Sequence, residues 1–189
     1  MLIRFTMVEL PISAEEKFRE AVYFFNRMLE TRTNVYELPF NFSAFLSAMR
    51  SVTLYLQEQF AKNEGFGDWY ATKQQEMRGD ILLSMLKDMR NEVLHARPIQ
   101  LLISAGPELP EEGVQTKHFE MTLDTDRKGN ILIRTKFTED SPGMESQVIA
   151  DWHFVAYDKA NVFEVCDKGL RTIRILLDEW YRMQKQKDV

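Results

Sequence analysis

Apolar side chains recur at steps of three and four residues near both ends of the chain, which places them on one face of an α-helix. The spacing predicts four helices, over about 14–32, 41–62, 69–96 and 161–185. The pattern SAEE, beginning at Ser13, is a capping box that starts the first helix. Pro98 ends the third, because proline disfavours helix at the residue before it. Gly79 could kink the third helix or split it in two.

Proline and aspartate residues predict where the second and third helices begin. Pro39 disfavours helix in the residues before it, so 34–40 is predicted to be a connection. Asp68 lies in a break at 65–69 and is predicted to cap the third helix.

The middle of the chain changes to a period of two, in which alternate residues share one face of a β-strand. Three antiparallel strands are predicted over 115–123, 131–137 and 148–157, with 99–104 as an ambiguous fourth. The first two flank a turn in which Gly129 can take a positive φ. We expect Ala150, Trp152 and Phe154 on the apolar face of the third strand, and Leu123 on that of the first.

These elements together predict an α+β fold in a single domain of 189 residues. An antiparallel helical bundle of four main helices, from 1–98 and 158–189, would carry a small three- to four-stranded antiparallel β-sheet. The sheet, over 99–157, would be inserted between the third and last helices and would pack on the bundle by its apolar face.

Composition narrows the classes of function. The net charge of −5 means that the surface as a whole does not attract polyanions, so any contact with nucleic acid has to be local. Cys166 is the single cysteine, which excludes an internal disulfide framework and favours a reducing, cytoplasmic compartment. The chain contains no apolar run of about 18 residues and no signal-peptide pattern, so neither a membrane helix nor contact with a membrane is expected.

Candidate chemistry concentrates at the end of the third predicted helix, in the run KDMRNEVLHARP from Lys87 to Pro98. One polar stripe at steps of three and four residues combines Asp80, Ser84, Asp88, Asn91 and His95. Asn91 lies four residues before His95 and shares its face, whereas Arg90 lies roughly 140° from His95 on an ideal helix. Either the helix ends between Arg90 and His95, or a second copy of the chain completes the site.

The run Arg90 to His95 resembles the R-N-x-x-x-H motif of the HEPN superfamily (higher eukaryotes and prokaryotes nucleotide-binding). Members are all-α bundles with this motif late in the third helix, commonly dimers whose motifs face each other. Many are metal-independent ribonucleases, including toxins. The stretch 42–52 also looks like the second helix of small bacterial members. The inserted sheet departs from the minimal bundle, as does Arg97, where some toxins have a tyrosine that a partner enzyme modifies.

The resemblance implies roles for five residues. Arg90 would bind the scissile phosphate and stabilise the developing anion, and His95 would transfer protons. Asn91 would orient His95, and the flanking Lys87 and Arg97 would bind the substrate. Such a mechanism needs no metal, so no cofactor is expected.

The resulting hypothesis is a homodimeric RNA-binding protein that acts as a metal-independent endoribonuclease. The alternative is a non-catalytic HEPN-like module that binds a nucleotide or a protein partner such as an antitoxin. A third reading is a ligand-binding protein that uses the inserted sheet as a lid or platform. Without the resemblance, the motif residues would be read as a solvated helix face.

Three other groups of residues could have a function, but each also has an ordinary structural interpretation. Asp151 with His153, and His118 with Glu120, could form a metal site, but a wet polar sheet face is the better reading. Trp69 and Tyr70 could stack on a base, although aromatic residues that open a helix usually fix it to the core. Basic residues of the hairpin could contact RNA, although exposed charge is commoner there; they are Arg127, Lys128, Arg134 and Lys136.

Overall fold

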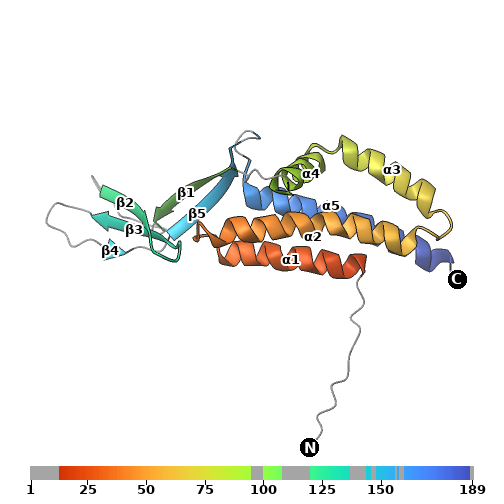
Figure 1. The fold of residues 1–189 in the computed structure, drawn as a ribbon, viewed down its shortest axis with the longest axis horizontal. Helices are drawn as coiled ribbons and strands as arrows, with labels where there is room; N and C mark the ends of the chain where they lie inside the picture. Colours follow the sequence, from red (N-terminus) through yellow and green to blue (C-terminus); the bar gives the residue numbers. More distant parts are fainter. Residues whose placement is uncertain are drawn as a thin grey trace, which may run out of the picture.

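The computed structural model describes residues 13–94, 100–107, 120–136, 144–145, 148–155, 157 and 160–187. These residues form helices α1 (Ala14–Glu30), α2 (Glu37–Phe60), α3 (Phe66–Gly79), α4 (Ile81–Leu94) and α5 (Val162–Lys187). The strands are β1 (Leu101–Pro107), β2 (Glu120–Thr125), β3 (Ile131–Lys136), β4 (Met144–Glu145) and β5 (Val148–Phe154). The helices occupy one end of an elongated molecule and the strands the other, so the fold is α+β (Figure 1).

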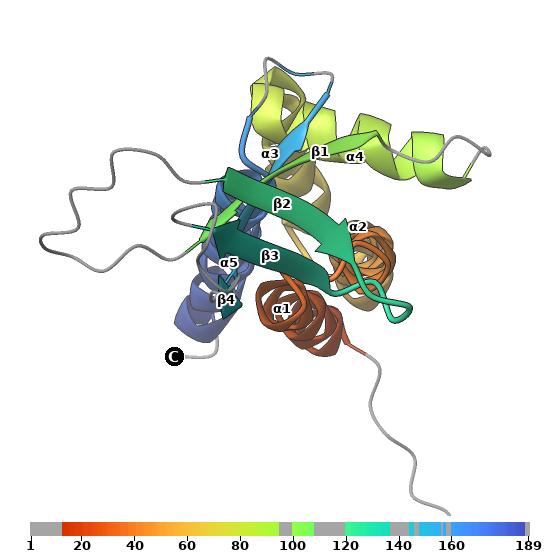
Figure 2. The same cartoon turned by 90° about the vertical axis from the view of Figure 1, so that its left-hand side faces the viewer.

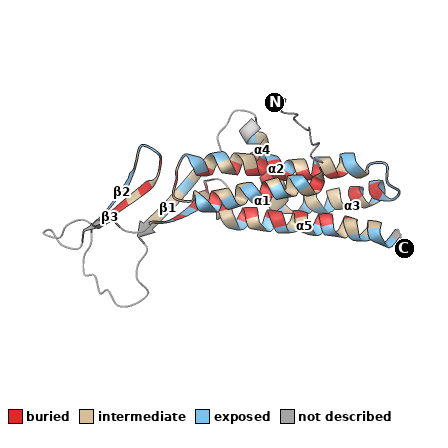
Figure 3. Ribbon diagram, turned by 90° about the horizontal axis from the view of Figure 1, so that it is seen from below, coloured by how far each residue is buried: buried red, intermediate tan, exposed pale blue. Residues whose placement is uncertain are grey.

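The helical end has an apolar core to which α1, α2, α4 and α5 all contribute. Helix α1 packs against α2 and α5, and α4 packs against the same two helices. Buried residues follow the inward side of each helix (Figure 3). The largest side chains that are almost completely buried include Trp180, Phe42, Phe45, Met28, Leu38, Leu56, Met89 and Leu177. None of the described helices is long and apolar enough to cross a membrane.

The first helix begins at its predicted cap, Ser13, and the last helix begins after Asn161, where its start was predicted. The Ser13 hydroxyl accepts a hydrogen bond from the Glu16 amide at 3.2 Å, and the Asn161 carboxamide oxygen accepts one from the Phe163 amide at 2.9 Å. Each bond pairs an amide that has no partner within its own helix. Periodicity and cap chemistry agree at these two places, and both predictions are confirmed.

The second helix begins earlier than predicted, at Glu37, so 34–36 is a connection and the reading of 37–40 as part of it is wrong. Pro39 lies in the first turn, where a helix makes no use of the missing N–H. The Asn34 side chain takes the place of a cap, because its oxygen accepts hydrogen bonds from the Tyr36 and Glu37 amides at 3.0 Å each.

The third predicted helix is two helices, so the bundle of four main helices becomes five helices in the described residues. Helix α3 begins at Phe66, after Gly65 with a φ of 78°, and Asp68 therefore lies within its first turn. The break follows Gly79, in agreement with the alternative in which this glycine splits the predicted helix in two. Asp80 is extended, with a φ of −80° and a ψ of 113°, and its carboxylate accepts the Leu82 and Leu83 amides at 2.8 and 3.0 Å.

The strands form two antiparallel sheets, β1–β5 and β2–β3–β4, and not the single predicted sheet (Figure 2). Strand β5 pairs with β1, in a register that sets Trp152 opposite Ile103. Ala150, Trp152 and Phe154 are buried as predicted, and the Phe154 ring lies 5.6 Å from that of Phe42 in the helical core. Leu123 is half exposed, so the prediction of its burial is wrong.

Asn34 joins the β-hairpin to the helices. Its side-chain nitrogen donates to the Lys128 carbonyl at 3.1 Å and to the Asn130 side chain at 3.0 Å. The Val35 amide donates to the carbonyl of Gly129, whose φ of 87° confirms the predicted turn. A Cβ at Gly129 would lie 2.3 Å from the Tyr36 ring, so the close approach also requires glycine.

We expect Asp80→Ala to destabilise the protein by about 1 kcal/mol, because the two α4 amides lose their cap. Urea denaturation followed by circular dichroism measures this loss. Asp88→Ala is the matched control, since the Asp88 carboxylate is exposed and lies 4.0 Å from its cation, Lys87. An Asp80→Ala variant as stable as the control would contradict the capping role.

Candidate functional site

A half-open pocket of about 320 Å³ lies between α2 and the α3–α4 pair, with part of its floor from α5. Its polar lining consists of Arg50, Thr53, Tyr70, Gln74, Arg78, Ser84, Lys87 and Arg90. Its apolar lining consists of Leu46, Met49, Met77, Leu83, Leu86 and Ile173. The volume is at the lower end of the range of small-molecule sites, about 300–1,000 Å³.

The break at Asp80 brings the basic residues of α3 and α4 to one side. Arg78 and Lys87 are nine residues apart, which on one continuous helix would set them about 180° from each other. The change of direction between α3 and α4 allows both to line the same pocket. Arg50 faces them from α2, where it lies on the border of the apolar stripe that contains Met49.

The pocket is positively charged and most of its charges are uncompensated. None of the described residues that line it is a carboxylate. Within the described part of the chain, Arg50, Arg78 and Arg90 form no ion pair, and the one carboxylate contact of Lys87 is the 4.0 Å approach of exposed Asp88. In a chain with a net charge of −5, three unpaired arginines beside a weakly paired lysine mark a candidate anion site.

One end of the pocket is organised around Thr53. The Arg50 guanidinium donates to the Thr53 hydroxyl at 3.0 Å, and that hydroxyl donates to the Arg50 carbonyl at 3.1 Å. The Tyr70 hydroxyl accepts from the Gln57 amide nitrogen at 3.0 Å. Burial raises the pKa of Tyr70, so its hydroxyl is a neutral polar group at physiological pH. These contacts fix the polar wall but use few of the guanidinium donors.

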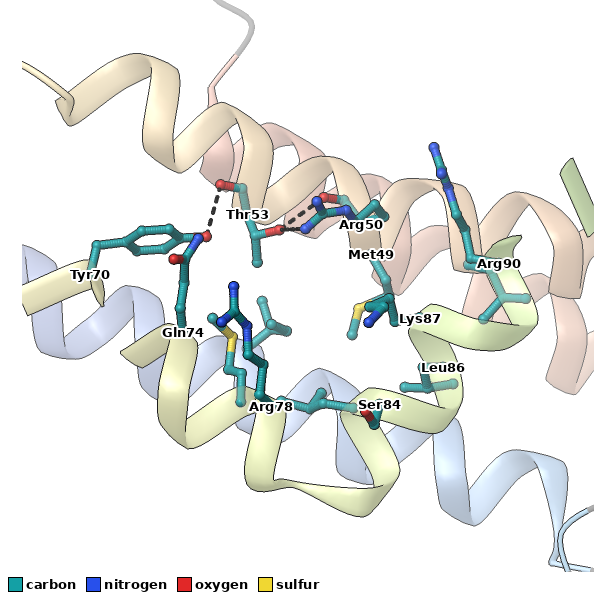
Figure 4. A pocket seen from close by; sticks show the side chains of 14 residues that line it. Met49, Arg50, Thr53, Tyr70, Gln74, Arg78, Ser84, Leu86, Lys87 and Arg90 are labelled. Carbon is teal, nitrogen blue, oxygen red and sulfur yellow. Dashed lines mark hydrogen bonds between the residues drawn. The ribbon is translucent and has the colours of Figure 1, made fainter. Parts of the chain in front are cut away.

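The arginines divide between the two ends of the pocket (Figure 4). Arg78 extends from α3 toward Thr53, on the side where Arg50 also lies. Arg90 stands at the other end, and its guanidinium points away from Arg78. We call the part formed by Arg50, Thr53, Gln74 and Arg78 the inner corner. Lys87 and Arg90 form the motif end.

Of the five residues assigned from the motif, Lys87, Arg90 and Asn91 are described. The Arg90 Nη1 donates to the Asn91 side-chain oxygen at 3.4 Å, while its Nε is buried and has no acceptor among the described residues. His95 and Arg97 lie outside the described residues. The orientation of His95 by Asn91 therefore stays a prediction.

The opposite side of the α4 terminus is acidic. Tyr157, which has a φ of 71°, lies close enough to Glu92 and Asp88 for their charges to raise its pKa, although burial is the larger cause. Helix α4 thus presents Lys87 and Arg90 to the pocket and carboxylates to the loop after β5. An anionic ligand would be drawn to the pocket side alone.

The other candidate sites have structural roles. Trp69 lies in an aromatic cluster with Phe66 and Trp180, 5.8 and 5.0 Å away, and its indole donates to Glu179. It therefore fixes α3 to the core. The Asp151 carboxylate lies 3.7 Å from Arg32, and no group of three or more metal-ligating side chains occurs in the described regions.

Sequence reasoning missed Arg50 and Arg78. Tyr70, Gln74 and Arg78 recur at steps of four, a polar line that was visible in the sequence. That this line faces Arg50 depends on the position of the helix break. Comparison of the chain with models of known protein families, with curated proteins and with solved structures finds no match. The functional argument therefore rests on the residues themselves.

Because like charges in the pocket repel, we expect Arg78→Gln to leave the protein equally stable or to stabilise it by up to about 0.5 kcal/mol at low salt. Added sodium chloride should remove the difference by screening. Thermal unfolding at two salt concentrations measures both effects. Arg171→Gln is the control. It should lower the stability of the protein, because Arg171 pairs with Asp167 at 2.8 Å. Clear destabilisation by Arg78→Gln would show that Arg78 has a structural role.

Proposed function

We propose that the chain is an HEPN-like RNA-binding protein that cleaves RNA as a homodimer without a metal. The observation that carries the proposal is the position of Arg90. This arginine of the R-N-x-x-x-H run lines a pocket whose three arginines have no ion pair among the described residues, and whose lysine, Lys87, has only the 4.0 Å contact with exposed Asp88. A site of this charge suits a phosphate backbone better than a neutral or cationic substrate.

Arg90 supplies a charge that is permanent and planar. Its terminal nitrogens can donate to two oxygens of one phosphate, and their charge counters the extra negative charge of the pentavalent transition state. The hydrogen bond from Arg90 to Asn91 gives Asn91 a second role, that of restricting the guanidinium. Asn91 is in this respect a positioning residue.

His95 is proposed as the proton-transfer group. It would accept the proton of the RNA 2′-hydroxyl as the 2′-oxygen attacks phosphorus, or donate a proton to the departing 5′-oxygen. The products would be a 2′,3′-cyclic phosphate and a 5′-hydroxyl end. One histidine serves one of the two transfers at a time, so a second His95 from a partner chain would complete the pair. This is the reason for proposing a dimer.

The second candidate is a non-catalytic module that binds a nucleotide or a protein partner. What favours nucleotide binding is the shape of the site. Met49, Met77 and Leu83 give the pocket an apolar surface beside its arginines, a combination that suits a single ring with a charged group. A bound nucleotide without RNA cleavage would support this candidate over the nuclease.

The test is cleavage of a labelled RNA in the presence of a chelator. We expect fragments with 2′,3′-cyclic phosphate ends, and a loss of rate of about 100-fold or more in both Arg90→Ala and His95→Ala, because each removes charge stabilisation or proton transfer. Arg19→Ala is the matched control. Arg19 is an exposed arginine on α1, paired with Glu16 and remote from the pocket.

Cleavage that survives both substitutions would reject the assignment, and so would cleavage that requires a metal. Mixing Arg90→Ala with His95→Ala tests the composite site. Partial recovery of activity in the mixed dimer would indicate that the two residues act from different chains.

A further inference from the structure

The inner corner of the pocket has features that the cleavage reaction does not use. Arg50 and Arg78 extend toward Thr53 from α2 and α3, whereas Arg90 points away from them. No described hydrogen bond or ion pair engages Arg78, and one hydrogen bond from the Arg50 side chain, to Thr53, is observed. Most of their N–H donors are therefore available to a ligand.

The neighbouring polar groups are suited to hold anionic oxygens. Gln74, four residues before Arg78, lies on the same face of α3, and its amide, which hydrogen-bonds to the Tyr70 hydroxyl, has a second N–H for a ligand. Lys87 stands between the inner corner and the motif end and adds a third positive charge. With no carboxylate in the lining, a doubly charged group is favoured over a singly charged one.

The rest of the lining is apolar. Met49 from α2, Met77 and Leu83 from either side of the helix break, and Ile173 from α5 form a surface next to the charges. A free inorganic anion would leave this apolar surface exposed to water. An anion attached to a ring or a short aliphatic body would cover it and displace that water.

We propose that the inner corner is a binding site for an organic phosphate monoester, whose dianionic phosphoryl group lies between Arg50 and Arg78 and whose apolar body lies on Met49, Met77 and Leu83. The site is independent of the proposed cleavage of RNA. A phosphate diester carries one charge and would use the pair of arginines less well. The monoester can be a small molecule or the phosphorylated end of an RNA.

The experiment uses the full-length protein and isothermal titration with phenyl phosphate, methyl phosphate and phenol. Phenyl phosphate is expected to bind about tenfold more tightly than methyl phosphate, because its ring covers the apolar lining. Phenol should show no binding, because it lacks the charge. Affinity should fall below about pH 6, where the dianion of a phosphate monoester takes up a proton and becomes a monoanion.

Arg50→Gln and Arg78→Gln are each expected to weaken phenyl phosphate binding by about 10- to 100-fold, the effect of losing a charge-assisted hydrogen bond. Arg78→Lys should recover only part of the loss, because lysine lacks the planar pair of donors. Arg19→Gln should bind as the unaltered protein does. Circular dichroism establishes that each variant is folded. Unchanged affinity in folded Arg50→Gln and Arg78→Gln would overturn the proposal, as would equal affinity for all three compounds.

Two further measurements test whether the site is independent of RNA cleavage and which kind of monoester it binds. His95→Ala is expected to keep phenyl phosphate binding while it loses RNA cleavage, and loss of both would contradict an independent site. A 5′-phosphorylated trinucleotide, and the same trinucleotide with a 5′-hydroxyl, are then each tested for displacement of bound phenyl phosphate. Displacement by the phosphorylated form alone assigns the site to an RNA end, and displacement by neither assigns it to a small molecule. Equal displacement by both would overturn the preference for a monoester.

Discussion

The hydrogen bonds from the Leu82 and Leu83 amides to the Asp80 carboxylate hold the chain where one helix stops and the next starts in a new direction. The pocket depends on this turn, since it gives Arg78 and Lys87 a common side. At its other end α3 is held by Trp69 and Phe66 against Trp180. The helix is thus fixed near both ends, and its middle turns, with Gln74, form a wall of the pocket.

The positive charges of the pocket repel one another, and this repulsion lowers the stability of the folded chain. Arg171 and Arg19 on the surface are paired with carboxylates, whereas the pocket arginines have no ion pair among the described residues. Proteins commonly sacrifice some stability at sites that bind ligands. The acidic side of α4, with Asp88 and Glu92 near Tyr157, confines the positive region to one face.

Local signals were sufficient for some elements and not for others. The capping box at Ser13 predicted the start of α1, because a helix start is decided within a few residues. Strand partners are decided by the whole fold, so the pairing of β5 with β1 could not be predicted from alternation. The same distinction between local and tertiary information applies to the residues of the pocket. Arg90 was identified from its motif, while Arg50 and Arg78 meet only through tertiary geometry.

The burial of β5 in the helical core has a consequence for how the chain evolves and folds. Phe154 packs on Phe42, and Asn34 binds the hairpin turn, so residues more than 90 positions apart must meet before the fold is complete. Contacts of such sequence separation slow folding. The segment between α4 and α5 is therefore not a module that could be deleted or exchanged. Its removal would expose Phe42 and leave the Asn34 amide without acceptors, and the helices would lose part of their own core.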